Sequence, residues 1–142
     1  MVGQIILSLS AAVLLLLGGA GMFAAPEVAS WLGASHTGAT ALVVQLAGCG
    51  MLGFALQNWL ARKNRIGGIY ARPLGLANLL LFAGAALSIG KALASKTLPM
   101  GWLWLLASFA GLAIGFAWLI FMHDPLADGS PAKGTAAAKA PE

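Results

Sequence analysis

The sequence predicts an all-α, polytopic membrane protein: a bundle of four transmembrane helices with a short interfacial helix after the first. Hydrophobic residues make up 60% of the 142 residues and charged residues only 8%, whereas about a quarter of the residues of soluble domains are charged. The apolar residues form four long runs, each of about twenty residues, which is enough for a helix to cross the hydrocarbon core. Almost all charged residues lie between or after these runs. A soluble domain could not bury so much apolar surface.

The first run predicts a helix over about residues 3–25, which ends where Pro26 removes a backbone donor. We expect this helix to be retained and not cleaved as a signal peptide, because residues 1–4 carry no Lys or Arg and the apolar stretch is long. Residues 26–32 then predict a short interfacial helix. Proline suits its first turn, Glu27 its positive end and Trp31 the headgroup layer.

The other three spans are expected at about residues 40–61, 73–93 and 100–122. Residues 1–124 therefore form one transmembrane domain. The segment 125–142 is rich in Ala, Gly, Pro and Lys and has few large apolar side chains, so we expect a disordered cytoplasmic tail.

Lys and Arg are unequally shared between the two sides of this topology. The loop between the second and third spans and the tail carry Arg62, Lys63, Arg65, Arg72, Lys133 and Lys139, and the opposite side carries only Lys91 and Lys96. Positive residues favour the cytoplasmic side, so both termini are predicted to be cytoplasmic. The same layout excludes a nucleic-acid-binding role for the net charge of +4, since the cations follow the membrane topology.

Small residues at helical spacing predict close helix packing, either within one chain or between copies. In lipid, helices associate through close contacts and polar groups rather than through water exclusion. The predicted packing residues are Gly53, Gly84, Ser88, Ser108, Gly111 and Gly115. Gly18 and Gly19 offer a further close approach on the first helix.

Neutral amides are the most prominent polar groups inside the spans. Gln45, Gln57, Asn58 and Asn78 are candidates for a polar notch near the cytoplasmic ends of the second and third helices. Gln45 and Gln57 share one helical stripe with Cys49 and Gly53, at four-residue steps. Hydrogen bonding between helices is the simpler interpretation, and binding of a ligand headgroup or a partner chain is the alternative. Only the second predicts that Gln57→Leu spares folding but abolishes binding.

The loop that carries Arg62, Lys63, Arg65 and Arg72 combines clustered cations with an interfacial Trp59. Such clusters set topology and attract anionic lipids. A phosphate-binding loop is not expected, because the lysine and hydroxyl of a nucleotide-binding motif are missing.

The Asn58-Trp59 pair, the loop 66–70, Arg72-Pro73 and Asn78 resemble small bacterial inner-membrane proteins with four helices. The length and the helix-then-proline layout around Pro26 are also weakly similar to the DoxX-like group. The resemblance implies a bacterial inner membrane and transfers no catalytic role.

No ionisable side chain lies near the middle of a span, which argues against a proton-coupled antiporter. His36 and His123 are expected on opposite sides of the membrane, so they predict no shared metal or haem. The single Cys49 lies in mid-span without a base nearby in sequence. We therefore expect neither an enzyme nor a cofactor.

Three functions remain open from the sequence. The favoured one is a non-enzymatic structural or accessory subunit that packs in the bilayer with itself or with a larger complex. The second is a small permease for an uncharged solute, with the stripe from Gln45 to Gln57 along its path. The third is a quinone- or lipid-handling accessory of a redox system, by analogy with the DoxX-like group.

Overall fold

The computed structural model describes residues 2–34, 37–63 and 71–122. Its elements are α1 (Val2–Phe23), α2 (Ala25–Trp31), α3 (Gly38–Ala61), α4 (Ala71–Ala94), the 3₁₀ turn η1 (Met100–Trp102) and α5 (Leu103–Phe121). Four helices are long and apolar enough to cross a membrane, and the short α2 follows the first. The predicted fold class is confirmed. Arg65 and the predicted tail 125–142 lie outside the described residues.

The helix ends follow local sequence signals. Pro26 stands in the first turn of α2 and Glu27 follows it, as the sequence predicts. The Thr37 side chain accepts a hydrogen bond from the Thr40 backbone N–H at 3.2 Å and so caps α3. Pro99 directly precedes η1, and the fourth span enters α5 through this single tighter turn.

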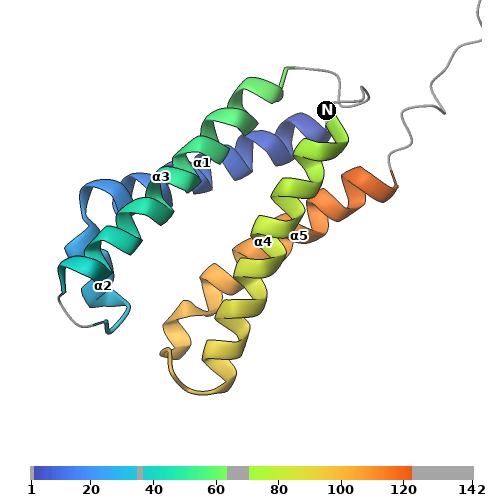
Figure 1. Ribbon diagram of the computed structural model, residues 1–142. Helices are drawn as coiled ribbons and strands as arrows, with labels where there is room; N and C mark the ends of the chain where they lie inside the picture. The colour runs from blue at the N-terminus through green and yellow to red at the C-terminus, as the bar shows by residue number, and fades with distance from the viewer. Residues whose placement is uncertain (1, 35–36, 64–70, 123–142) are drawn as a thin grey trace, which may run out of the picture.

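The four long helices form two antiparallel pairs, α1 with α3 and α4 with α5 (Figure 1). The pairs meet at the end that holds the start of α1, the end of α3 and the start of α4. They diverge toward α2 and η1 (Figure 1). Contact between the pairs is therefore concentrated at one end of the spans.

The first pair packs through glycine. A Cβ atom on Gly48 would lie 2.7 Å from the Met22 backbone nitrogen and 2.9 Å from the Gly18 carbonyl oxygen, closer than real Cβ atoms approach. A Cβ atom on Gly21 would lie 3.2 Å from the Gly48 Cα. The close approach expected at Gly18 is confirmed, whereas Gly19 faces open space.

The second pair packs through aromatic rings. The fully buried Phe82 of α4 lies 5.6 Å from Phe109 and 5.8 Å from Phe116 between ring centroids. Leu7 and Leu14 of α1 belong to the same apolar cluster as these rings, so this core joins the two pairs.

Several of the small residues predicted to pack do not pack within the chain. A Cβ atom on Gly53, Gly84 or Gly111 would meet no neighbouring group within 4 Å. Helix rotation turns each of these three glycines outward in the single chain, so of the two kinds of packing expected for them only contact between copies stays a prediction. Gly115 does face another helix, since its Cβ would lie 3.4 Å from the Ile6 Cδ1 atom.

The two serines predicted to pack bond to their own helices. Ser88 donates to the Gly84 carbonyl and Ser108 to the Trp104 carbonyl, both at 2.8 Å. Their hydroxyls are therefore satisfied without a neighbouring helix.

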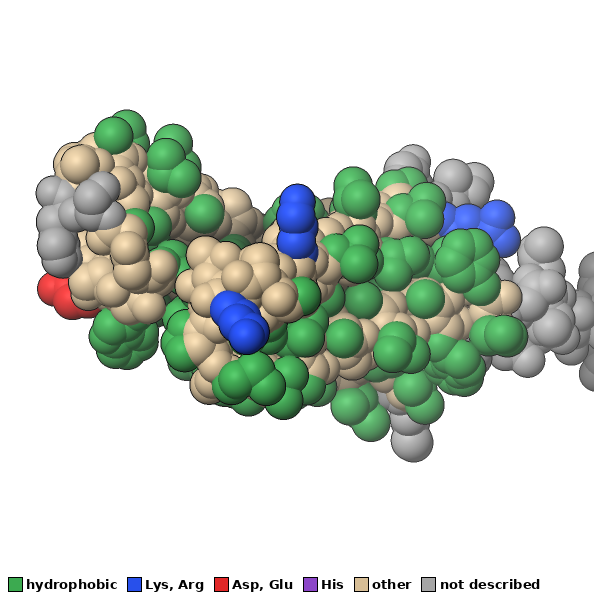
Figure 2. Space-filling view, turned by 90° about the horizontal axis from the view of Figure 1, so that it is seen from below, with side chains coloured by type: hydrophobic (Ala, Val, Ile, Leu, Met, Phe, Trp, Pro, Cys, Tyr) green, Lys and Arg blue, Asp and Glu red, His purple; other side chains and the backbone are tan. Residues whose placement is uncertain are grey.

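Large apolar side chains cover much of the surface. Leu16, Leu80 and Phe121 are each more than 70% exposed. Apolar side chains spread over the face in Figure 2, and Lys and Arg appear there only at separate points. Such a surface suits hydrocarbon, and the protein is an integral membrane protein in contact with the lipid bilayer.

Candidate functional site: a buried polar cluster and its surroundings

Three helices bring fully buried polar side chains together where the two pairs meet. Asn58 of α3 and Asn78 of α4 form a reciprocal amide pair: each Nδ2 donates to the other residue's Oδ1, at 2.7 Å from Asn58 and 2.8 Å from Asn78. The Asn58 Nδ2 also donates to the Ser10 Oγ of α1 at 3.0 Å. All three residues are 0% exposed. We call Ser10, Asn58 and Asn78 the polar cluster.

The hydrogen-bond donors of the polar cluster are all satisfied by the chain. The second Asn78 N–H group donates to the Leu74 carbonyl at 2.9 Å, and the Ser10 hydroxyl donates to the Leu7 carbonyl at 2.9 Å. An asparagine amide offers two N–H donors and one carbonyl acceptor, and here each of these groups has a partner. The polar cluster therefore joins α1, α3 and α4 without needing a ligand.

The polar cluster lies inside the spans, toward the end where the two helix pairs meet; Asn58 is three residues before the end of α3. At about 1.5 Å per helical residue, Ser10 lies about 12 Å along the helix axis from the first residue of α1. Asn78 lies about 10 Å along the axis from the first residue of α4. Neutral amides and a hydroxyl are the groups that hold membrane helices together by hydrogen bonding. With neither a charge nor an activated nucleophile, the three side chains are suited to holding helices and not to acid–base chemistry.

The four predicted notch residues separate into two groups. Asn58 and Asn78 are joined in the polar cluster, whereas Gln45 and Gln57 are exposed on another side of α3. The residues Gln45, Cys49, Gly53 and Gln57 are all exposed. We call these four residues the α3 outer face.

Sequence reasoning missed Ser10 and Gly48. Ser10 is one of two serines in the first span, and nothing in its local pattern distinguishes it from Ser8. The signal that could have found it is chemical: the N–H groups of a buried asparagine need acceptors, and few polar side chains are available inside the spans.

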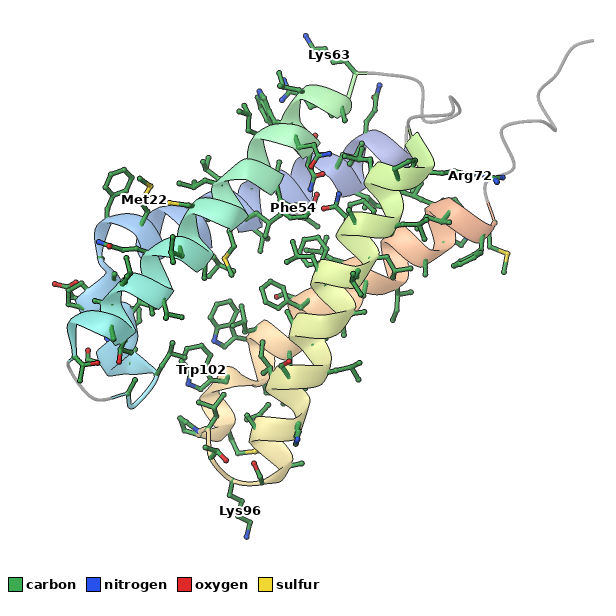
Figure 3. All side chains as sticks on the ribbon, in the orientation of Figure 1. Met22, Phe54, Lys63, Arg72, Lys96 and Trp102 are labelled. Atoms are coloured by element: carbon green, nitrogen blue, oxygen red, sulfur yellow. The ribbon has the colours of Figure 1, made fainter. Side chains whose placement is uncertain are left out.

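Basic residues border the polar cluster at the end of α3 and the start of α4. Arg62 follows Asn58 by one helical turn, and its backbone N–H donates to the Asn58 carbonyl at 3.1 Å. Lys63 and Arg72 are exposed at the same end, opposite Lys96 (Figure 3). Of the predicted anionic-lipid loop, the structure thus describes Arg62, Lys63 and Arg72.

No metal-binding group emerges from the part of the chain that the structure describes. No three His, Cys, Asp or Glu side chains lie together in residues 2–34, 37–63 and 71–122. The Cys49 thiol lies 3.9 Å from the Met22 sulfur, across the α1–α3 contact.

Comparison with protein-family models, with curated proteins and with solved structures finds no match to this chain. Its class is therefore defined by its own helices: it is a small membrane protein with four candidate spans.

Proposed function

We propose that the protein is a non-enzymatic structural or accessory subunit that packs in the bilayer with another chain through the α3 outer face. The single observation that carries this proposal is the exposure of Gln45 within a membrane-spanning helix. Gln45 lies about 7 Å from the midpoint of α3 along the helix axis, at about 1.5 Å per residue. That depth lies inside a hydrocarbon core about 30 Å thick.

An amide that faces hydrocarbon has lost its water without gaining a hydrogen bond. Neither the Gln45 nor the Gln57 side chain makes a hydrogen bond within the described residues, in contrast to the polar cluster, and of the two Gln45 lies deeper in the span because Gln57 is four residues from the end of α3. Lipid tails offer no donors or acceptors, so each unpaired group is costly. A second protein chain removes this cost, because an amide both donates and accepts.

The space between the two amides suits a helix of another chain. Gly53 lies between them, and a Cβ atom there would meet nothing within 4 Å. A small residue on an outward face lets another helix backbone approach closely. A second copy fits this face in a parallel arrangement, since both copies then hold Gln45 at the same depth.

The permease alternative loses support from the same geometry. It requires the stripe from Gln45 to Gln57 to line a path, but the stripe lies on the outside of α3 in a single chain. A path along it would have to run between chains.

We also propose a bacterial inner membrane with both termini in the cytoplasm. Arg62 follows the end of α3, and Lys63 and Arg72 lie at the same end of the helices (Figure 3), which supports the orientation because such residues favour the cytoplasmic side. The bacterial setting comes from the resemblance of the segment around α3 and α4.

Cys49 allows a direct test, since it is the only cysteine and lies on the α3 outer face. Benzophenone maleimide attached to Cys49 in native membranes and irradiated should capture a chain that packs there. A product of twice the monomer mass identifies a second copy, and any other product identifies a subunit of a larger complex by mass spectrometry. Efficient labelling without a protein product would overturn the proposal.

The matched control moves the probe to α4. A Cys49→Ser, Leu80→Cys protein carries the same label at a 76% exposed position of the other pair, and we expect no protein product there. Gln45→Leu should lower capture at Cys49, whereas Gly111→Leu on α5 should not.

A further inference from the structure

Arg62 holds its guanidinium group in an unusual position at the end of α3. The Cζ atom lies 3.0 Å from the centroid of the Trp59 ring, so the cation rests on the indole face. The Nη1 atom is buried and has no hydrogen-bond partner among the described residues. A guanidinium N–H without an acceptor is costly to bury. The Nη1 atom itself is closed to an outside molecule, but the Arg62 side chain as a whole is only partly buried, so its other N–H groups are open to an acceptor from outside these residues.

The chain supplies no nearby carboxylate from its described part. Across residues 2–34, 37–63 and 71–122, the one acidic side chain is Glu27. It belongs to α2, at the opposite end of the α1–α3 pair from Arg62 (Figure 1). Glu27 therefore cannot neutralise Arg62.

The surroundings of Arg62 match the depth of lipid phosphates. Arg62 directly follows Ala61, the last residue of α3 and of a candidate span. Trp59 is 53% exposed beside it, and tryptophan favours the headgroup layer. Lys63 is exposed next to Arg62 and adds a second positive charge (Figure 3).

We propose that Arg62, Trp59 and Lys63 form a binding site for the phosphate of an anionic lipid headgroup. The planar guanidinium group matches two phosphate oxygens, and stacking on Trp59 fixes its plane before the lipid arrives. Lys63 contributes charge without a fixed geometry. The hydrophobic part of the lipid then lies along the end of α3, beside the exposed Trp59. This site is separate from the α3 outer face and does not depend on the proposed function.

Native mass spectrometry of the full chain in mild detergent tests the site by titration with phosphatidylglycerol. Arg62→Gln should weaken retention of the lipid about fivefold, the factor expected for loss of one interfacial cation. Arg62→Lys keeps the charge but loses the planar pair of donors, so its lipid retention should lie between that of the native chain and that of Arg62→Gln. Lys96→Gln, at the other end of the helices, is the matched control and should retain lipid as the native chain does.

Other probes separate the sources of phosphate. Equal retention of phosphatidylcholine would overturn selectivity for an anionic headgroup. Displacement of phosphatidylglycerol by millimolar inorganic phosphate would assign the site to free phosphate and overturn the lipid assignment. Unchanged retention by Arg62→Gln and Arg62→Lys, with native helix content by circular dichroism, would overturn the site itself.

Discussion

Asn58 and Asn78 bond to each other twice, through N–H···O bonds of 2.7 and 2.8 Å, although they belong to different helix pairs. The contacts between the pairs gather at one end of the spans (Figure 1). This amide pair, extended by Ser10, is therefore a polar connection between the α1–α3 and α4–α5 pairs.

Replacing either asparagine should destabilise the protein, because the other asparagine is then left buried without its hydrogen-bond partner. We expect Asn58→Leu or Asn78→Leu to lower the free energy of unfolding by about 1–3 kcal/mol, because the remaining buried amide loses its bonds. The measurement is equilibrium unfolding in mixed detergent micelles.

The double variant measures the interaction between Asn58 and Asn78 separately from the other effects of each single replacement. Asn58→Leu with Asn78→Leu should cost less than the sum of the single changes, since it removes both partners together. Gln57→Leu, next to Asn58 but exposed, is the control and should leave monomer stability nearly unchanged. Additive single effects would contradict a coupled pair.

Gly48→Ala should weaken the contact between α1 and α3. The new Cβ atom would lie within 2.9 Å of backbone atoms at Gly18, Gly21 and Met22, and these cannot move without separating the helices. We expect a loss of about 1–3 kcal/mol, as for an overpacked core, measured by thermal unfolding.

Gly53→Ala is the matched control on the same helix. Its Cβ atom would meet nothing within 4 Å, so monomer stability should stay the same or rise slightly from the better helix propensity of alanine. Equal losses at Gly48 and Gly53 would mean that close packing at Gly48 is not the cause.

Phe82→Ala should remove the centre of the aromatic core. The ring is fully buried and contacts both Phe109 and Phe116, so we expect a cost of about 3–5 kcal/mol from the resulting cavity. Circular dichroism during heating in detergent measures it. Leu80→Ala, at an exposed position on the same helix, should cost far less.

The membrane orientation predicts which reporter fusions are active. Alkaline phosphatase inserted at Lys96 should be active, and the same enzyme fused after Lys139 should be inactive, because it folds only outside the cytoplasm. The reverse pattern would contradict an orientation with both termini in the cytoplasm.

The sequence by itself determined the number, approximate bounds and membrane character of the long helices. Span length and hydropathy are properties of contiguous residues, and so are the signals that begin or end a helix, such as Pro26 before α2. The asparagines of the polar cluster were also recognisable, since an amide inside an apolar run needs a partner.

Only the tertiary structure decided which side of each helix faces another helix. Gly48 and Gly53 are five residues apart in α3, yet one touches α1 and the other faces open space. Asn58 is buried and the adjacent Gln57 is exposed. The physical reason is that lipid and protein interior are both apolar, so hydrophobic periodicity carries little information about helix rotation in a membrane. That rotation is set by contacts between residues far apart in sequence, such as Ser10 with Asn58 and Gly18 with Gly48.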